Sequence, residues 1–82
     1  MKYYLVFESI GHNRTLTWIV KSKHTTPFQA WFHESLDADP TLGVQNDRDL
    51  VSQDDIFVFT EGKEISEEVF NFLKSLGIRS IQ

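Results

Sequence analysis

The sequence contains no cysteine, and its basic side chains are outnumbered by its acidic ones, eight to twelve. Without cysteine the chain can form no disulfide, no thiolate zinc site and no cysteine nucleophile. It also lacks any long hydrophobic run: residues 3–7 are apolar, but Glu8 follows them directly. A run of this length is too short to span a membrane or to form the core of a signal peptide. We therefore expect a cytoplasmic protein that does not enter a membrane.

The sequence also lacks the motifs of the common enzyme classes. Its four glycines are scattered, so it has no glycine-rich nucleotide loop and no Gly-x-Ser-x-Gly nucleophile motif. His33 with Asp37 four residues later is the nearest approach to a zinc motif, and two ligands are too few. The spacing of His12, His24 and His33 is irregular and fixes no shared geometry. We therefore predict that the protein is not an enzyme and binds no cofactor or metal.

What the sequence does contain is a high proportion of large aromatic side chains. Seven Phe, two Tyr and two Trp make up 13% of the chain. A chain of this size buries only about 60% of its unfolded surface, so a stable core needs large side chains. We expect one domain that spans residues 1–82.

Two strands joined by a turn are predicted at the start of the chain. Residues 2–10 and 15–23 are rich in β-branched and aromatic residues, and Gly-His-Asn-Arg at 11–14 is typical of a turn. The register that we expect places Leu5 opposite Val20 on a face that forms the core. The opposite face would then carry four apolar side chains, Tyr4, Val6, Ile10 and Ile19.

Two helices are predicted from their capping residues. Thr26 followed by Pro27 begins the first helix, which ends at Asp39 because a proline follows. Ser66 begins the second helix, and Gly77 fits the position just after its last turn.

The remaining segments are one interior strand, a long loop and a short end. Residues 56–59 are apolar at every position, which is typical of an interior strand, and Gly62 is expected to end that strand. Residues 40–53 are polar without a clear period, and we interpret them as a loop with at most a short strand at Leu50 and Val51. Residues 78–82 are expected to form a short last strand.

These elements predict an α+β fold of order β-β-α-β-α-(β). We expect one small mixed sheet in strand order 2-1-3-4, with the two helices packed mainly on one face. The other face would then expose more apolar surface than a monomer usually leaves uncovered. Either the 40–53 loop or a partner would cover it.

The leading functional hypothesis is a non-catalytic protein-binding module. The net charge of −4 lies wholly in residues 42–82, which carry eight acidic and four basic side chains. A short, acidic, aromatic-rich profile without cysteine is similar to that of small phage-encoded proteins that inhibit host or defence enzymes. Contact with a protein partner, or with a second copy in a homodimer, would use the exposed sheet face and the acidic loop. These contact residues are Tyr4, Val6, Ile19, Asp47, Arg48, Asp49, Asp54 and Asp55.

A second hypothesis is nucleic-acid binding at the end of the first hairpin. The expected register places Lys2 opposite Lys23 and Tyr4 opposite Lys21, so phosphates could neutralise the lysines while a base stacks on Tyr4. The candidate residues are Lys2, Tyr4, Arg14, Lys21, Lys23 and His24.

A third and weaker hypothesis is a metal-dependent hydrolase. Asp54 and Asp55 immediately precede the predicted interior strand. Carboxylates at a strand end can anchor a divalent cation. No third ligand is placed by spacing.

Overall fold

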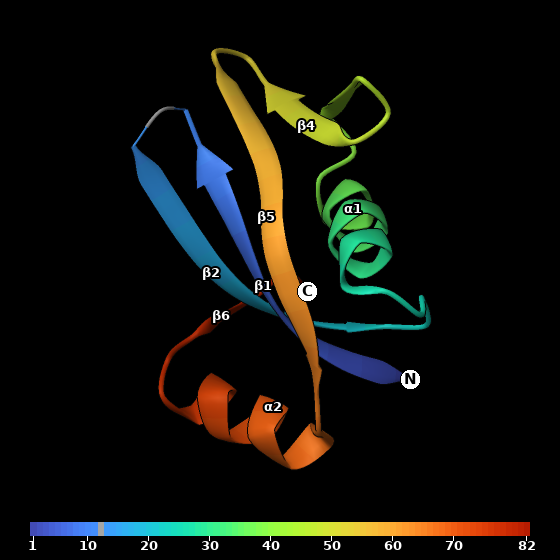
Figure 1. Cartoon of the computed structure of the whole chain (residues 1–82), viewed down its shortest axis with the longest axis vertical. Coiled ribbons are helices and arrows are strands. Elements are labelled where there is room, and N and C mark those ends of the chain that lie inside the picture. Colours follow the sequence, from blue (N-terminus) through green and yellow to red (C-terminus); the bar gives the residue numbers. More distant parts are fainter. Residues whose placement is uncertain (12) are drawn as a thin grey trace.

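The computed structural model describes residues 1–11 and 13–82, so His12 in the predicted first turn lies outside the described residues. In these residues one mixed six-stranded sheet packs with two helices (Figure 1), which confirms the α+β class and the order of the predicted elements. The elements are β1 (Lys2–Ile10), β2 (Arg14–Ser22), α1 (Pro27–Ala38), β3 (Gly43–Gln45), β4 (Asp49–Ser52), β5 (Asp55–Ile65), α2 (Glu67–Ser75) and β6 (Arg79–Ser80).

The sheet has the strand order β3-β4-β5-β1-β2-β6. Neighbouring strands are antiparallel, except that β6 runs parallel to β2. The predicted neighbours β2-β1-β5 are correct, but the last strand was expected beside β5 and lies instead beside β2. β4 occupies the edge of β5 that faces away from β1. The chain therefore passes from β5 through α2 across β1 and β2, and β6 pairs with the outer edge of β2. Ile81 N–H then donates to the carbonyl of Ile19 at 3.0 Å.

The register of the first hairpin differs from the prediction by one residue. Tyr4 pairs with Val20 and Val6 pairs with Trp18, whereas the prediction placed Leu5 opposite Val20. Because side chains alternate along a strand, a shift of one residue exchanges the two faces of β1. The face that was expected to be exposed is therefore the core, where Tyr4 and Val6 are fully buried.

The physical reason for this register lies at Glu8. Glu8 shares the face of Tyr4 and Val6, and the prediction turned that face outward. In the structure Glu8 is buried, and the indole Nε1 of Trp31 donates a hydrogen bond to its Oε1 at 3.1 Å. A buried carboxyl group is tolerated when it has such a partner.

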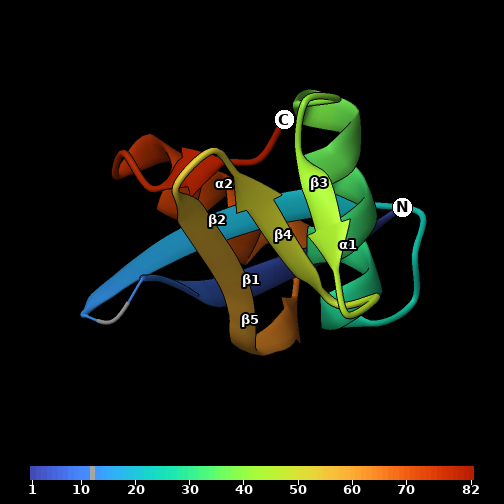
Figure 2. The same cartoon turned by 90° about the horizontal axis from the view of Figure 1, so that it is seen from above.

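The two helices pack on opposite faces of the sheet, which differs from the expected packing mainly on one face. α1 contributes Ala30 and Trp31 to the cluster that contains Tyr4 and Val6. α2 packs on the other face, where the rings of Tyr3 and Phe70 lie 5.0 Å apart between centroids. Figures 1 and 2 show α1 and α2 well separated around the strands. Since residues 3–7 are apolar on both faces, each face needs its own cover.

The segment 40–53 contains two short strands, β3 and β4, rather than only a loop. The turn between them places Asn46 and Asp47 at φ 57° and 59°, and Arg48 N–H donates to the carbonyl of Gln45 at 3.2 Å. Positive φ at both central residues is the geometry of a tight two-residue hairpin turn. A second tight turn at Gln53 joins β4 to β5. β5 continues to Ile65, so the prediction that Gly62 ends this strand is wrong.

The predicted helix ends are confirmed. The Thr26 hydroxyl accepts a hydrogen bond from Gln29 N–H at 3.1 Å, and the Ser66 hydroxyl accepts one from Val69 N–H at 3.1 Å. Gly77 has φ 93°, and the amide after it donates to the carbonyl of Leu73 at 3.1 Å. This is the Schellman arrangement that favours glycine after a helix.

Gly62 has a different role from the one predicted. A Cβ atom at this position would lie 2.6 Å from Cβ of Pro27 and 3.0 Å from Cγ1 of Val6. Glycine therefore lets the first turn of α1 approach β5 closely.

We predict that Gly62→Ala destabilises the fold by about 1–3 kcal/mol, because the proline ring beside it is rigid. The measurement is the free energy of unfolding from urea denaturation. Lys63→Ala, an exposed change on the same strand, is the control and should alter it by less than about 0.5 kcal/mol. Equal stability of the two variants would contradict the close approach.

Candidate functional site

The predicted apolar contact residues are not on the surface. Tyr4, Val6 and Ile19 are all fully buried. Tyr4 and Val6 lie beneath α1, whereas Ile19 pairs with Leu5 and so belongs to the face of α2. The Tyr4 hydroxyl donates to the carbonyl of His24 at 2.7 Å, and burial raises its pKa. These three side chains hold the fold together and cannot contact a partner.

The predicted acidic contact residues lie at exposed tight turns. The turn between β3 and β4 carries Asp47 and Arg48, with Asp49 half-buried at the start of β4. The turn between β4 and β5 carries Asp54, and Asp55 begins β5. Figure 1 places this end of the sheet far from α2. In the described part of the chain, no three His, Asp or Glu side chains are grouped to hold a metal ion.

The predicted basic residues do not form one patch. Lys2 pairs with Ser22 rather than with Lys23, and its Nζ lies 3.3 Å from the Glu64 carboxylate. Lys21 is opposite Tyr3 rather than Tyr4, so it projects from the face opposite to that of Lys2. Arg14 begins β2, and Lys23 directly follows the other end of this strand, about 25 Å away. Buried Tyr4 cannot stack on a base.

The structure brings two histidines together that the sequence did not connect. The rings of His24 and His33 stack with centroids 4.3 Å apart. The His33 Nε2 lies 2.8 Å from the Gln29 Oε1, one turn earlier in α1. Tertiary packing creates this pair, since the chain from β2 turns back along α1, and no sequence spacing signals it.

An exposed apolar stripe runs along α2. Val69, Phe72 and Leu76 are 43%, 60% and 63% exposed, while Phe70 of the same helix is buried against the sheet. Their spacing of three and four residues places them on one side of the helix. α2 therefore carries apolar residues on two sides, one packed against the sheet and one exposed.

A cavity of about 210 Å³ opens between the sheet and the C-terminal end of α1. Four strands form its floor and α1 forms one wall, while the segments after α1 and β6 complete it. Most of its lining is apolar, but Glu8 from β1 lies within it. The lining residues are Glu8, Trp18, Ser35, Ala38, Asp39, Leu42, Leu50, Phe57 and Ile81.

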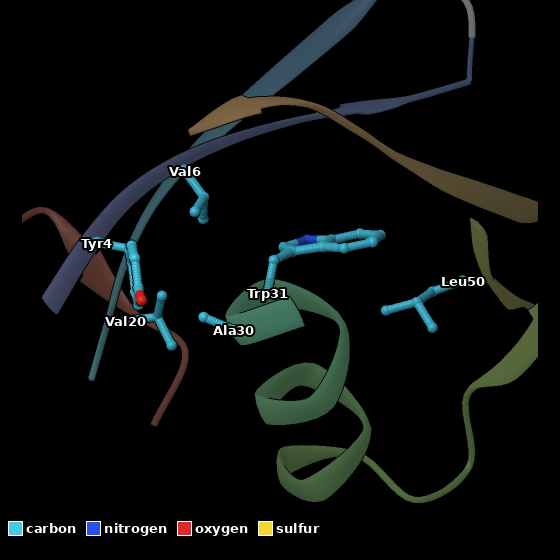
Figure 3. Packing of buried hydrophobic residues seen from close by; sticks show 6 residues of the cluster. All are labelled: Tyr4, Val6, Val20, Ala30, Trp31 and Leu50. Carbon is cyan, nitrogen blue, oxygen red and sulfur yellow. The ribbon is translucent and has the colours of Figure 1, made fainter. Parts of the chain in front are cut away.

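Glu8 is the distinctive group of this cavity. It is 5% exposed, and its carboxyl group is held by the N–H of Trp31. Figure 3 shows the indole of Trp31 between Val6 and Leu50, with its nitrogen toward the sheet. Burial raises the pKa of Glu8, and the N–H groups of Trp31 and then Trp18 oppose this rise. The N–H group of Trp18 is close enough to Glu8 to favour the ionised form of its carboxyl group. Within residues 1–11 and 13–82, however, this buried Nε1 makes no well-formed hydrogen bond.

The backbone is irregular beside this carboxyl group. Phe7 pairs with Glu61 and Glu8 pairs with Phe59, so Thr60 is an extra residue in β5. Its hydroxyl donates to the carbonyl of Phe7 at 2.9 Å. Such bulges re-aim neighbouring side chains and are common beside functional sites. Glu8 is the only charged residue in the mostly apolar stretch 3–10, and this was the signal for the site in the sequence. The signal was missed because Glu8 was assigned to the exposed face.

Comparison of the chain with models of known protein families, with curated protein sequences and with solved structures finds no match. Within the described residues, neither helix is long and apolar enough to cross a membrane.

Glu8 should make stability depend on pH in a defined direction. Because burial raises its pKa in the folded state, its contribution is fully present below the unfolded pKa of about 4.3 and is lost as pH rises through the folded value. Glu8→Gln stays neutral and keeps an oxygen for Trp31. We expect the free energy of unfolding of this variant, relative to the wild type, to increase between about pH 4 and pH 8.

Urea denaturation of both proteins across this range is the measurement. Glu61→Gln, at an exposed position, is the control and should show no comparable trend. A relative stability of Glu8→Gln that falls with rising pH would contradict the assignment.

Proposed function

We propose that the protein is a non-catalytic protein-binding module that inserts the exposed stripe of α2 into an apolar groove on a partner protein. The observation that carries this proposal is the exposure of Val69, Phe72 and Leu76 along one side of a well-capped helix. Helices that bind in grooves present apolar anchors at this type of spacing, i, i+3 and i+7. Exposed large apolar side chains gathered in one place are uncommon on a surface without a partner.

The charges around α2 indicate the chemistry of the partner. Glu67 and Glu68 occupy the first turn of α2, and Glu61 is exposed on the preceding strand. Carboxylates there complement a basic rim, which would steer association and fix the orientation of the helix. We therefore infer that the partner groove is apolar at its centre and bordered by Lys or Arg. If that groove adjoins an active site, occupation blocks the site, which is the inhibitory role predicted from the sequence.

The other predicted surfaces contribute less to this proposal. The acidic turns lie at the opposite end of the molecule from α2 (Figure 1), and Tyr4, Val6 and Ile19 are buried. A nucleic acid would meet scattered lysines and an acidic second half of the chain. A parallel homodimer through α2 would bring two acidic first turns together, and only an antiparallel one would place each beside Lys74 of the other copy. A partner protein with a basic rim fits these charges better.

We predict that Phe72→Ser combined with Leu76→Ser weakens partner binding by about 30-fold or more, since central apolar anchors dominate such interfaces. The free energy of unfolding should change by less than about 0.5 kcal/mol, because both side chains are largely exposed. The measurement is affinity capture from host lysate with the wild type and the variant, followed by calorimetry with the purified retained protein.

The control for this experiment is the pair Val44→Ser and Ile56→Ser, which removes exposed apolar side chains on the two strands that flank β4. It should leave partner binding unchanged. Equal loss in both double variants would contradict an interface on α2. Sedimentation of the free protein completes the test, since a wild-type dimer that the α2 variant dissociates would assign the stripe to self-association instead.

A further inference from the structure

We propose that the cavity beside Glu8 binds a small organic amine in its ammonium form, with an apolar body of about one aromatic ring and Glu8 as its counter-ion. This inference is independent of the proposed role of α2, because it depends on a different part of the molecule. It follows from the size of the cavity, the charge of its lining and the polar groups at its floor.

The size of the cavity sets the size of the ligand. It measures about 210 Å³. An apolar cavity of about 150 Å³ in another protein holds a benzene molecule. The larger volume here accommodates one ring with a short polar substituent. Its walls include Leu42, Leu50 and Phe57, which suit the apolar body of such a molecule.

The charge around the cavity selects a cation. Its only ionisable lining groups among the described residues are the carboxyl groups of Glu8 and Asp39. The last turn of α1 borders the cavity and contains no basic residue, so the negative end of this helix faces no positive side chain of its own. An anionic ligand would be repelled by all three features, whereas an ammonium group is attracted by them.

The polar groups at the floor distinguish this cavity from a packing defect. Empty cavities in proteins are lined by apolar groups. Here the buried carboxyl group of Glu8 has one well-formed N–H donor, from Trp31, and keeps lone pairs that can accept further hydrogen bonds. Buried polar atoms that are incompletely satisfied in this way often mark a site for a ligand. An ammonium group beside Glu8 would neutralise its charge and add hydrogen bonds to the carboxylate.

The cavity has an entrance at the C-terminal end of α1. Ala38 and Asp39 line it and are exposed. The Asp39 carboxylate already accepts hydrogen bonds from the amide and hydroxyl of Thr41, at 3.1 and 2.5 Å. Asp39 is therefore fixed at the entrance, where its charge attracts a cation. Inside the cavity, Glu8 is the group that pairs with this cation.

Titration with benzylamine tests the proposal, followed by nuclear magnetic resonance of the indole N–H groups. The chain has two Trp residues, and both lie at the site, Trp18 in the cavity lining and Trp31 against Glu8. We expect saturable shifts of both indole resonances with benzylamine. Benzyl alcohol, a neutral molecule of the same shape, should bind at least ten times more weakly, and phenylacetate should not bind.

Variants locate the binding. Glu8→Gln should weaken benzylamine binding at least tenfold, whereas Glu34→Gln changes a buried carboxyl group outside the cavity and should leave it unchanged. Equal affinity for benzylamine and benzyl alcohol in the wild type would overturn the role of Glu8 without need of any variant. Absence of saturable shifts with benzylamine, or equal weakening by the two variants, would overturn the site itself.

Discussion

The hydrogen bond from the Trp31 indole to the Glu8 carboxyl group is the interaction on which the arrangement of this molecule depends. It joins α1 to the central strand β1 and turns the face of Tyr4 and Val6 inward. A buried carboxyl group without a partner would be costly, and a hydrogen bond contributes about 0.5–1.5 kcal/mol when that group is neutral and about 1.5–3 kcal/mol when it is ionised. The one-residue alternative register would expose Glu8 but remove Tyr4 and Val6 from the core.

This register determines which surfaces remain free. β1 is apolar on both faces, so α1 covers one and α2 covers part of the other. α2 is short, and it uses Phe70 to bind the sheet while Val69, Phe72 and Leu76 remain exposed. The same bond also leaves a carboxyl group at the edge of a cavity lined mainly by apolar residues. The two proposed binding surfaces therefore follow from one choice of register, although they lie on different elements.

Much of the fold could be predicted from local signals in the sequence. Thr26, Ser66 and Gly77 mark helix ends through their own side chains or backbone freedom, and these ends are confirmed. Register could not be predicted in this way, because it depends on a contact between residues 8 and 31, which lie 23 positions apart. The strand β3 was missed because it has only three residues, whereas β4 contains Leu50 and Val51, where a short strand was considered.

The candidate sites were harder to predict than the fold, for related reasons. Exposure of Phe72 depends on where α2 meets the sheet, and an apolar helical stripe normally indicates a core position. The cavity arises where segments distant in sequence meet around Glu8. The available signal was Glu8, a charged residue within a mostly apolar strand. It was assigned to the exposed face because its partner Trp31 could not be identified from the sequence.

The most direct test of this account is the pKa of Glu8 itself, measured by carbon-13 resonance titration of its side-chain carboxyl group. Burial between β1 and α1 predicts a pKa above the ordinary value of about 4.3 for glutamate. A pKa at or below that value would show that solvation or the donated indole N–H groups outweigh burial at this carboxyl group. It would contradict burial as the dominant influence on Glu8.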